Sequence, residues 1–286
     1  MATYELQDDI ELVCELLGIS VRTLCADLDI SRMTLNRWVK NPEQATRSKL
    51  ETFYAYAFNK GIHLGEIHAQ LFEEETYARG LVPLFHGSKR GIVGELSTDC
   101  SRSDNDFGKG FYCGESFKRS ALFVARYPES ICYQVAFDVA GLRDKQFKVN
   151  NEWMLAIAFY RGKLAGYEGH PLLQAICCAV EQADYVVAPI ADNRIFQIID
   201  EFVEGEITDA QCEHSLSATH LGCQYVLRSD ESLQHVKVMR PQYLCKPQKQ
   251  LYLTQQKEQA KTGNDKSKAA RRQYRGQGRY IEELLQ

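Results

Sequence analysis

Apolar positions in the first forty residues follow helical spacing rather than the alternation typical of a strand. Leu24 and Leu28 are four positions apart, and Leu35 and Trp38 are three apart, so each pair lies on one face of a short helix. The spacing breaks once between the two pairs and then resumes. The pattern therefore predicts two short helices joined by a tight turn.

The residues around this turn are typical of a helix-turn-helix. Ser20 and Ser31 each stand where a side chain can cap the start of a helix. The segment resembles the helix-turn-helix of bacterial and phage repressors, in which a small residue stands at the position of Cys25 and a glycine at that of Asp29. Aspartate tolerates the left-handed conformation that the turn requires, although less readily than glycine.

The second helix of the pair is expected to present four side chains to solvent. Arginine and asparagine are the side chains that read guanine and adenine edges in a major groove. The expected DNA-binding residues are Arg32, Met33, Asn36 and Arg37. A helix-turn-helix can also serve as a protein-docking module, so both interpretations stay open.

Helical patterning continues to about residue 76, and strand and loop patterns begin after Gly80. His63 and His68 are five positions apart, a spacing that does not place two metal ligands on one helical face, so we expect two surface histidines. The fold class predicted is α+β. An all-α helix-turn-helix domain at residues 1–76 precedes a second domain at residues 81–239.

Composition and charge add limits on the class of protein. The 286 residues are 44% apolar, which excludes disorder throughout and suits two modest domains. Ten cysteines without a CxxC pair favour a reduced compartment. With an acidic N-terminus and no run of about 18 apolar residues, we expect no secretion signal, no membrane contact and a soluble, cytoplasmic protein.

The charge is distributed unevenly along the chain. Residues 240–286 hold 11 Lys and Arg against 4 Asp and Glu, whereas residues 1–239 hold 23 against 34. Such a block is typical of a solvated, mobile tail, which is the expectation for residues 240–286. Contact of this tail with a nucleic acid or an acidic partner is the alternative.

Three separated segments carry the candidate chemistry. LFHGS at 84–88 reads as an apolar strand that ends in a His-Gly turn, and CQYVL at 223–227 reads as a strand with an amide near its start. Between them, DFGKGFY at 106–112 reads as a glycine-bracketed turn that leads to a tyrosine. Each segment taken singly also fits a structural role: a strand-end histidine, a core tyrosine and an edge glutamine.

Together, the three segments resemble the catalytic domain of ADP-ribosyltransferases of the diphtheria-toxin and poly(ADP-ribose) polymerase type. The run DFGKGFY, with NEW at 151–153, ADNR at 191–194 and GCQY at 222–225, looks more closely like a bacterial family of uncharacterised domains in that superfamily. The resemblance covers roughly residues 81–239. It implies a split β-sheet with flanking helices and NAD as the substrate.

The resemblance also implies roles for individual residues. In the superfamily, the histidine binds the adenosine-side ribose of NAD, the next glycine and a helical serine hold the carboxamide, and two aromatic residues flank the nicotinamide. The NAD-binding residues implied are His86, Gly87, Ser88, Tyr112, Ser120 and Phe123. The second aromatic position is more often tyrosine, and phenylalanine keeps the stacking while it loses the hydroxyl.

Gln224 stands where the superfamily normally has a glutamate that binds the ribose and stabilises the oxocarbenium ion. By resemblance the catalytic residues are His86, Tyr112 and Gln224. A neutral amide brings no charge to the developing cation and cannot act as a general base near neutral pH. We therefore expect a slower enzyme that transfers a single ADP-ribose.

The acceptor side of the reaction is less defined. Glu152 and Asp200 are candidate bases, and Asp106 and Asp192 are favoured because the family resemblance runs through them. Each of the four is also interpretable as a structural or solvated carboxylate. The chemistry requires no metal.

Three functions remain open. The first is an NAD-dependent mono-ADP-ribosyltransferase of toxin or phage-defence biology that modifies a protein or nucleic-acid acceptor and has a neutralising, antitoxin-type partner. The second is a helix-turn-helix transcription regulator that senses NAD or ADP-ribose without turnover. The third is a structural adaptor.

Overall fold

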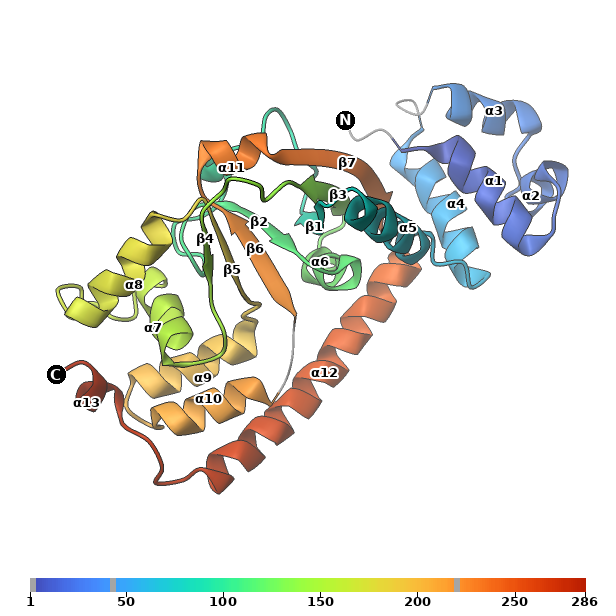
Figure 1. Cartoon of the computed structure of the whole chain (residues 1–286). Helices are drawn as coiled ribbons and strands as arrows, with labels where there is room; N and C mark the ends of the chain where they lie inside the picture. Colours follow the sequence, from blue (N-terminus) through green and yellow to red (C-terminus); the bar gives the residue numbers. More distant parts are fainter. Residues whose placement is uncertain (1–3, 42–44, 219–221) are drawn as a thin grey trace. The chain divides into compact units, whose positions relative to one another are not determined.

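The computed structural model describes residues 4–41, 45–218 and 222–286. Within this part of the chain lie an N-terminal helical region and seven strands with further helices, so the α+β class is confirmed (Figure 1). The chain forms two compact units, and each combines three separate stretches. The first unit contains 1–94, 116–138 and 237–255, and the second contains 95–115, 139–236 and 256–286. This division differs from the sequential boundaries expected from the sequence.

Five helices open the first unit. They are α1 Leu6–Leu17, α2 Val21–Asp27, α3 Arg32–Lys40, α4 Arg47–Asn59 and α5 Leu64–Ala78. The two predicted caps are confirmed, since Ser20 Oγ accepts from the Thr23 amide at 3.1 Å and Ser31 Oγ from the Thr34 amide at 3.0 Å. Asp29 has a φ of 52°, so the turn between α2 and α3 uses the left-handed conformation.

The expectation of two surface histidines is wrong for His68. This residue is 9% exposed, and its Nε2 lies 2.7 Å from Oδ1 of Asp9, which is also buried. Tyr54 and Arg240 donate to the same carboxylate at 2.5 and 2.6 Å. A buried carboxylate needs such partners, and residues far apart in the chain supply them.

The first unit also contains three strands and the start of α12. β1 Val82–Ser88 pairs antiparallel with β3 Ile131–Phe137, and β7 Val236–Tyr243 lies next to β3. α6 Phe117–Val124 packs on β1 and β3. Phe85 contacts the edge of Phe117, which fixes the helix on the strands through an aromatic core.

Four strands of the second unit run in the order β4, β5, β6, β2. Their bounds are β4 Asp144–Gln146, β5 Tyr185–Pro189, β6 Cys223–Leu227 and β2 Phe111–Gly114. β4 is parallel to β5, whereas β5 with β6 and β6 with β2 are antiparallel. The helical segments are the 3₁₀ turn Thr98–Cys100, α7 Asn151–Tyr160, α8 Pro171–Glu181, α9 Asn193–Val203, α10 Asp209–Ser217, α11 Asp230–Gln234 and α13 Ile281–Leu284.

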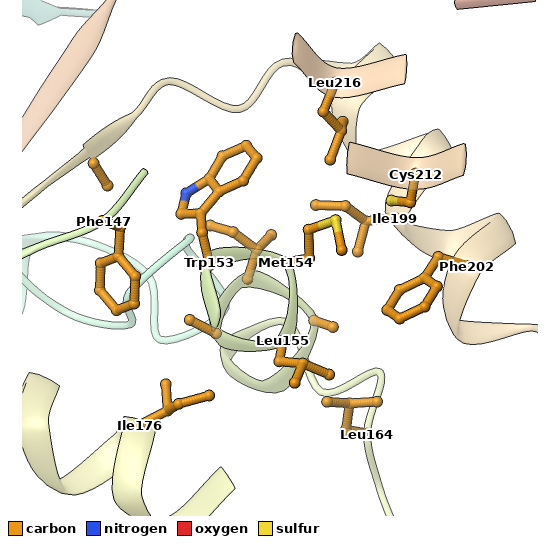
Figure 2. Packing of buried hydrophobic residues seen from close by; sticks show 14 of the residues in the cluster. Phe147, Trp153, Met154, Leu155, Leu164, Ile176, Ile199, Phe202, Cys212 and Leu216 are labelled. Carbon is orange, nitrogen blue, oxygen red and sulfur yellow. The ribbon is translucent and has the colours of Figure 1, made fainter. Parts of the chain in front are cut away.

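The core of the second unit surrounds α7 (Figure 2). Six consecutive residues of this helix, 153–158, are at most 1% exposed. A helix that is apolar on all sides must be covered on all sides, and α8, α9 and α10 contact it. Asn150 caps the start of α7, because its Oδ1 accepts from the Trp153 amide at 3.0 Å.

The basic C-terminal residues differ from the mobile tail expected. Residues Lys246–Gln273 form the single helix α12, which runs from the range of the first unit into that of the second. Tyr252 is 1% exposed in the first unit, and Ser267 is 3% exposed in the second. These two buried positions hold α12, and the sequence did not reveal them because they lie among many lysines. No helix of the described residues has the length and apolarity needed to cross a membrane.

Candidate active site

His86 lies where β1 changes from buried to half-buried positions. In the register of the antiparallel pair it stands opposite Tyr133 of β3, so the imidazole and the phenol lie on the same face. The Tyr133 hydroxyl accepts from the Ile92 amide at 3.1 Å, which anchors the loop that follows the strand. The imidazole is thus held on a rigid strand while it stays partly accessible.

Gly87 lets α6 approach β1 closely. A Cβ atom at this position would lie 2.5 Å from the carbonyl oxygen of Ser120. Ser120 is itself buried, and its Oγ donates to the Phe85 carbonyl at 2.9 Å. The structure therefore brings three predicted NAD-binding residues, His86, Gly87 and Ser120, together in the first unit, and gives the glycine a packing role as well. Ser88 follows at the half-buried end of the strand.

Phe123 is the exposed residue of this group. It lies on α6 with 70% of its surface accessible, whereas Leu122 and Val124 beside it are buried. An aromatic ring at this exposure has a free face on which a flat ligand can stack.

Tyr112 lies on β2, and its hydroxyl closes the preceding loop. It donates to the Gly108 carbonyl at 2.7 Å and accepts from the Phe107 amide at 3.2 Å. Burial raises the pKa of this phenol well above its ordinary value. The ring position is therefore fixed at both ends, by the strand and by the loop.

The two glycines of DFGKGFY each meet a local requirement. Gly108 has a φ of 72°, the left-handed region. Gly110 has no room for a side chain, because a Cβ there would lie 2.7 Å from Cγ1 of Val226 and 2.8 Å from the Leu227 carbonyl oxygen on β6. The motif thus builds the turn and seats β2 against β6.

Gln224 lies on β6, opposite Gly114 of β2 and two positions from the residue opposite Tyr112. It is 8% exposed. Its Nε2 donates to Oδ2 of Asp106 at 2.8 Å and to the Pro189 carbonyl at 3.2 Å. Tyr112 bonds to the backbone of Phe107, the residue after Asp106, and Gln224 bonds to the Asp106 side chain, so the three residues meet at one loop of the second unit.

Asp106 is 7% exposed, and Nη2 of Arg161 lies 2.9 Å from its Oδ1. Burial raises the pKa of this carboxyl, and the hydrogen bonds from Gln224 and Arg161 oppose the rise. A side chain so enclosed does not suit the expected role of acceptor-side base, which needs access to a macromolecule.

Two arginines that bond to Asp106 and Phe107 could not be identified from the sequence. Arg161 directly follows α7, and its guanidinium carbon lies 3.2 Å from the centre of the Phe196 ring. Arg228 follows β6 and donates to the Phe107 carbonyl. Neither belongs to one of the three segments. The sequence contains only an indirect indication of them, because an aspartate at the start of DFGKGFY needs a cation nearby if it is buried.

The other candidate bases have local partners. Asp192 caps α9, since its Oδ1 accepts from the Ile195 amide at 2.9 Å. Glu152 lies 2.6 Å from Lys145, and Asp200 lies 3.1 Å from Lys163. All three carboxylates thus have a local partner in the second unit, and the role of acceptor-side base stays a prediction for Asp192.

In the N-terminal helices, the four side chains expected to contact DNA are all exposed on α3: Arg32, Met33, Asn36 and Arg37. Leu35 and Trp38 on the opposite side are 2% and 3% exposed. The helix therefore separates a buried face from an exposed face that carries two arginines, an asparagine and the apolar Met33. Within residues 4–41, 45–218 and 222–286, no group of three or more His, Cys, Asp or Glu is arranged to hold a metal ion.

Comparison of the chain with models of protein families identifies a family. The model of a family described as "Protein of unknown function (DUF3990)" matches residues 82–238, which include β1, DFGKGFY and β6. No curated protein and no solved structure matches the chain.

Proposed function

The chain belongs to the family described as "Protein of unknown function (DUF3990)", and we propose that its matched region is an NAD-dependent mono-ADP-ribosyltransferase. The observation that carries the proposal is the pairing of β2 with β6, which puts the Tyr112 ring and the Gln224 amide on neighbouring strands. This joins the second and third segments of the superfamily resemblance, which lie more than a hundred positions apart in the chain.

Each group of residues has a chemical task in the proposed reaction. His86, Gly87 and Ser120 bind the adenosine-side ribose and the carboxamide of NAD. In the superfamily that the chain resembles, the residues at the positions of Tyr112 and Phe123 stack on the nicotinamide. The bond between the ribose and the nicotinamide nitrogen then breaks, nicotinamide leaves with the electron pair, and an oxocarbenium-like ribose forms.

Gln224 accepts a hydrogen bond from the ribose in this scheme. Its neutral carbonyl dipole stabilises the cation less than a carboxylate does, since hydrogen bonds with charged groups contribute about 1.5–3 kcal/mol and neutral ones about 0.5–1.5. A nucleophile of the acceptor attacks the ribose carbon and loses its proton, and one ADP-ribose is transferred. The acceptor is a macromolecule, a protein or a nucleic acid, and conflict biology with an antitoxin-type partner fits such an activity.

The test is nicotinamide release from NAD, together with labelling of a cell extract by tagged NAD. We expect wild-type turnover, and a loss of about 10²-fold or more in kcat/KM for His86→Ala, Tyr112→Ala and Gln224→Ala. Tyr77→Ala is the matched aromatic control, because Tyr77 is 66% exposed on α5 outside these groups. Nuclease and protease digestion of the label then identify the acceptor class.

The second candidate is a regulator that binds NAD or ADP-ribose without turnover, with α3 contacting DNA. The exposed polar face of α3 and the neutral Gln224 favour it. Calorimetric binding of NAD by wild type, without nicotinamide release or labelling, would establish this function in place of the enzyme.

A further inference from the structure

The Gln224 side chain has a defined orientation. Its Nε2 faces two oxygens, Oδ2 of Asp106 at 2.8 Å and the Pro189 carbonyl at 3.2 Å. A peptide carbonyl can only accept, so the NH₂ end of the amide must lie on this side. Both amide hydrogens are therefore used, and the carbonyl oxygen Oε1 is the atom left to bind a ligand.

The charged and titratable groups around Asp106 come from three elements. Arg161, after α7, pairs with its other oxygen at 2.9 Å. The Tyr112 phenol of β2 and the Arg228 guanidinium after β6 are both close enough to act on the same loop, since Phe107 bonds to each of them. The carboxylate is thus braced by Arg161 on one side while it accepts from Gln224 on the other.

We propose that Asp106 is the positioning residue of Gln224: it holds the amide so that Oε1 alone faces the ribose of NAD. This rests on the proposed function. The role differs from that of an acceptor-side base, because Asp106 acts through Gln224 and touches neither substrate nor acceptor.

A specific consequence follows for Gln224→Glu, the substitution that installs the residue usual in the superfamily. A carboxylate at this position would lie about 2.8 Å from Oδ2 of Asp106, and two carboxylates so close cannot both ionise. The variant must bind a proton or turn its side chain away. We therefore expect it to be less active than wild type near neutral pH, although glutamate is the better group for the chemistry.

The experiment is a four-protein cycle of the full chain: wild type, Asp106→Asn, Gln224→Glu and the double variant, assayed for nicotinamide release from pH 5.5 to 8.5. We expect kcat to fall about tenfold or more in each single variant at pH 7.5, with KM changed less than threefold. The activity of Gln224→Glu should rise as the pH falls, because one shared proton restores the pair. The double variant pairs an amide with a carboxylate again, with the charge at position 224. Because a carboxylate oxygen at this position still faces the Pro189 carbonyl, we expect partial recovery, to an activity above that of either single variant.

Asp184→Asn is the matched control. Asp184 is also buried and arginine-paired in the second unit, so its variant reports the effect of losing such a pair on folding, and it should keep wild-type kcat. Melting curves against pH give a readout without turnover. Gln224→Glu should lose thermal stability as the pH rises from 5.5 to 8.5, and the double variant should not.

The outcomes separate the two proposals. A wild type that does not release nicotinamide from NAD overturns the proposed transferase, whereas the melting curves still test the pairing of Asp106 with residue 224. Wild-type turnover with a Gln224→Glu variant that is fully active at pH 7.5, or with a double variant no better than either single one, overturns the role of Asp106 alone.

Discussion

Two buried carboxylates of the second unit are paired with arginine, yet their surroundings differ. Asp184 is 4% exposed and accepts from the backbone N, Nε and Nη2 of Arg143 at 2.9, 3.1 and 3.3 Å. Asp106 is 7% exposed and is shared between Arg161 and Gln224. The Arg143 side chain is 70% exposed, whereas that of Arg161 is 28% exposed.

The pKa directions of the two groups are opposite. Hydrogen bonds from Arg143 lower the pKa of Asp184 to about 2, whereas burial raises the pKa of Asp106. A lowered pKa means that folding favours the charged form and gains from it; a raised pKa means that folding tolerates the charge at a cost. Costly buried charges cluster at functional sites, and the difference between Asp184 and Asp106 separates a structural pair from a candidate site.

The largest effect should come from removing the cation of the Asp106 pair, and a much smaller one from removing the cation of the Asp184 pair. Arg161→Ala leaves Asp106 buried without a counter-charge, and we expect a loss of about 3–5 kcal/mol in the free energy of unfolding. Arg143→Ala removes an exposed guanidinium and leaves the backbone N of residue 143 as a donor, so about 1 kcal/mol or less is expected. Urea denaturation at pH 7 measures both.

The double variant Arg161→Ala/Asp106→Asn sharpens this result. It has no unpaired charge left, and it should recover most of the stability lost in Arg161→Ala, a strong departure from additivity. Equal losses for Arg161→Ala and Arg143→Ala would show that the two pairs are alike and remove the distinction.

The second prediction uses pH and concerns effects of about 1–3 kcal/mol. Since the folded pKa of Asp184 lies below the unfolded value of about 3.9, its contribution is present above that pH and is lost as the pH falls toward 2. For Asp106 the folded pKa is raised, so its contribution is largest below about pH 3.9 and declines as the pH rises.

The difference in unfolding free energy between wild type and each Asp→Asn variant, measured from pH 3 to 7, isolates the two groups. The curve for Asp184→Asn should show a wild-type advantage that grows with pH. The curve for Asp106→Asn should slope the other way. If the stability difference changed with pH in the same direction for both variants, the opposite pKa directions would be contradicted.

The distance along the chain between interacting residues decides what the sequence could predict. Local signals sufficed for the caps Ser20 and Ser31, for the turn at Asp29 and for the α+β class, because the residues that decide them are close in the chain. Gln224 and Tyr112 were identifiable by resemblance. Their link to Asp106 was not, because it depends on the register of β2 against β6 across more than a hundred residues.

Arg161 and the anchored helix α12 were missed for a related reason. Charge patterning alone describes lysine-rich residues 246–273 as a tail, and only the buried Tyr252 and Ser267 show that they are held. An arginine after an apolar helix has no distinguishing pattern until its acid is known. Whether a residue is buried depends on the elements that pack against it, and when those elements are distant in the chain the local sequence does not indicate the burial.

The smallest effect on stability is expected for arginines that have no acid partner. Arg32 and Arg37 are exposed on α3, and neither makes an ion pair within the described residues. Replacing both with alanine should change the unfolding free energy by less than about 0.5 kcal/mol. If α3 contacts DNA, the same variant should bind a mixed-sequence duplex more weakly, and the dependence of log affinity on log salt should flatten by about 0.9 for each phosphate that the protein no longer neutralises.

The matched control is Lys60→Ala with Arg79→Ala. It removes equal charge from exposed positions of the same unit and should leave the salt slope unchanged. An unchanged affinity and slope for the α3 variant would instead favour a protein-docking role, because a helix that contacts DNA cannot lose two cations from its free face without releasing fewer counterions.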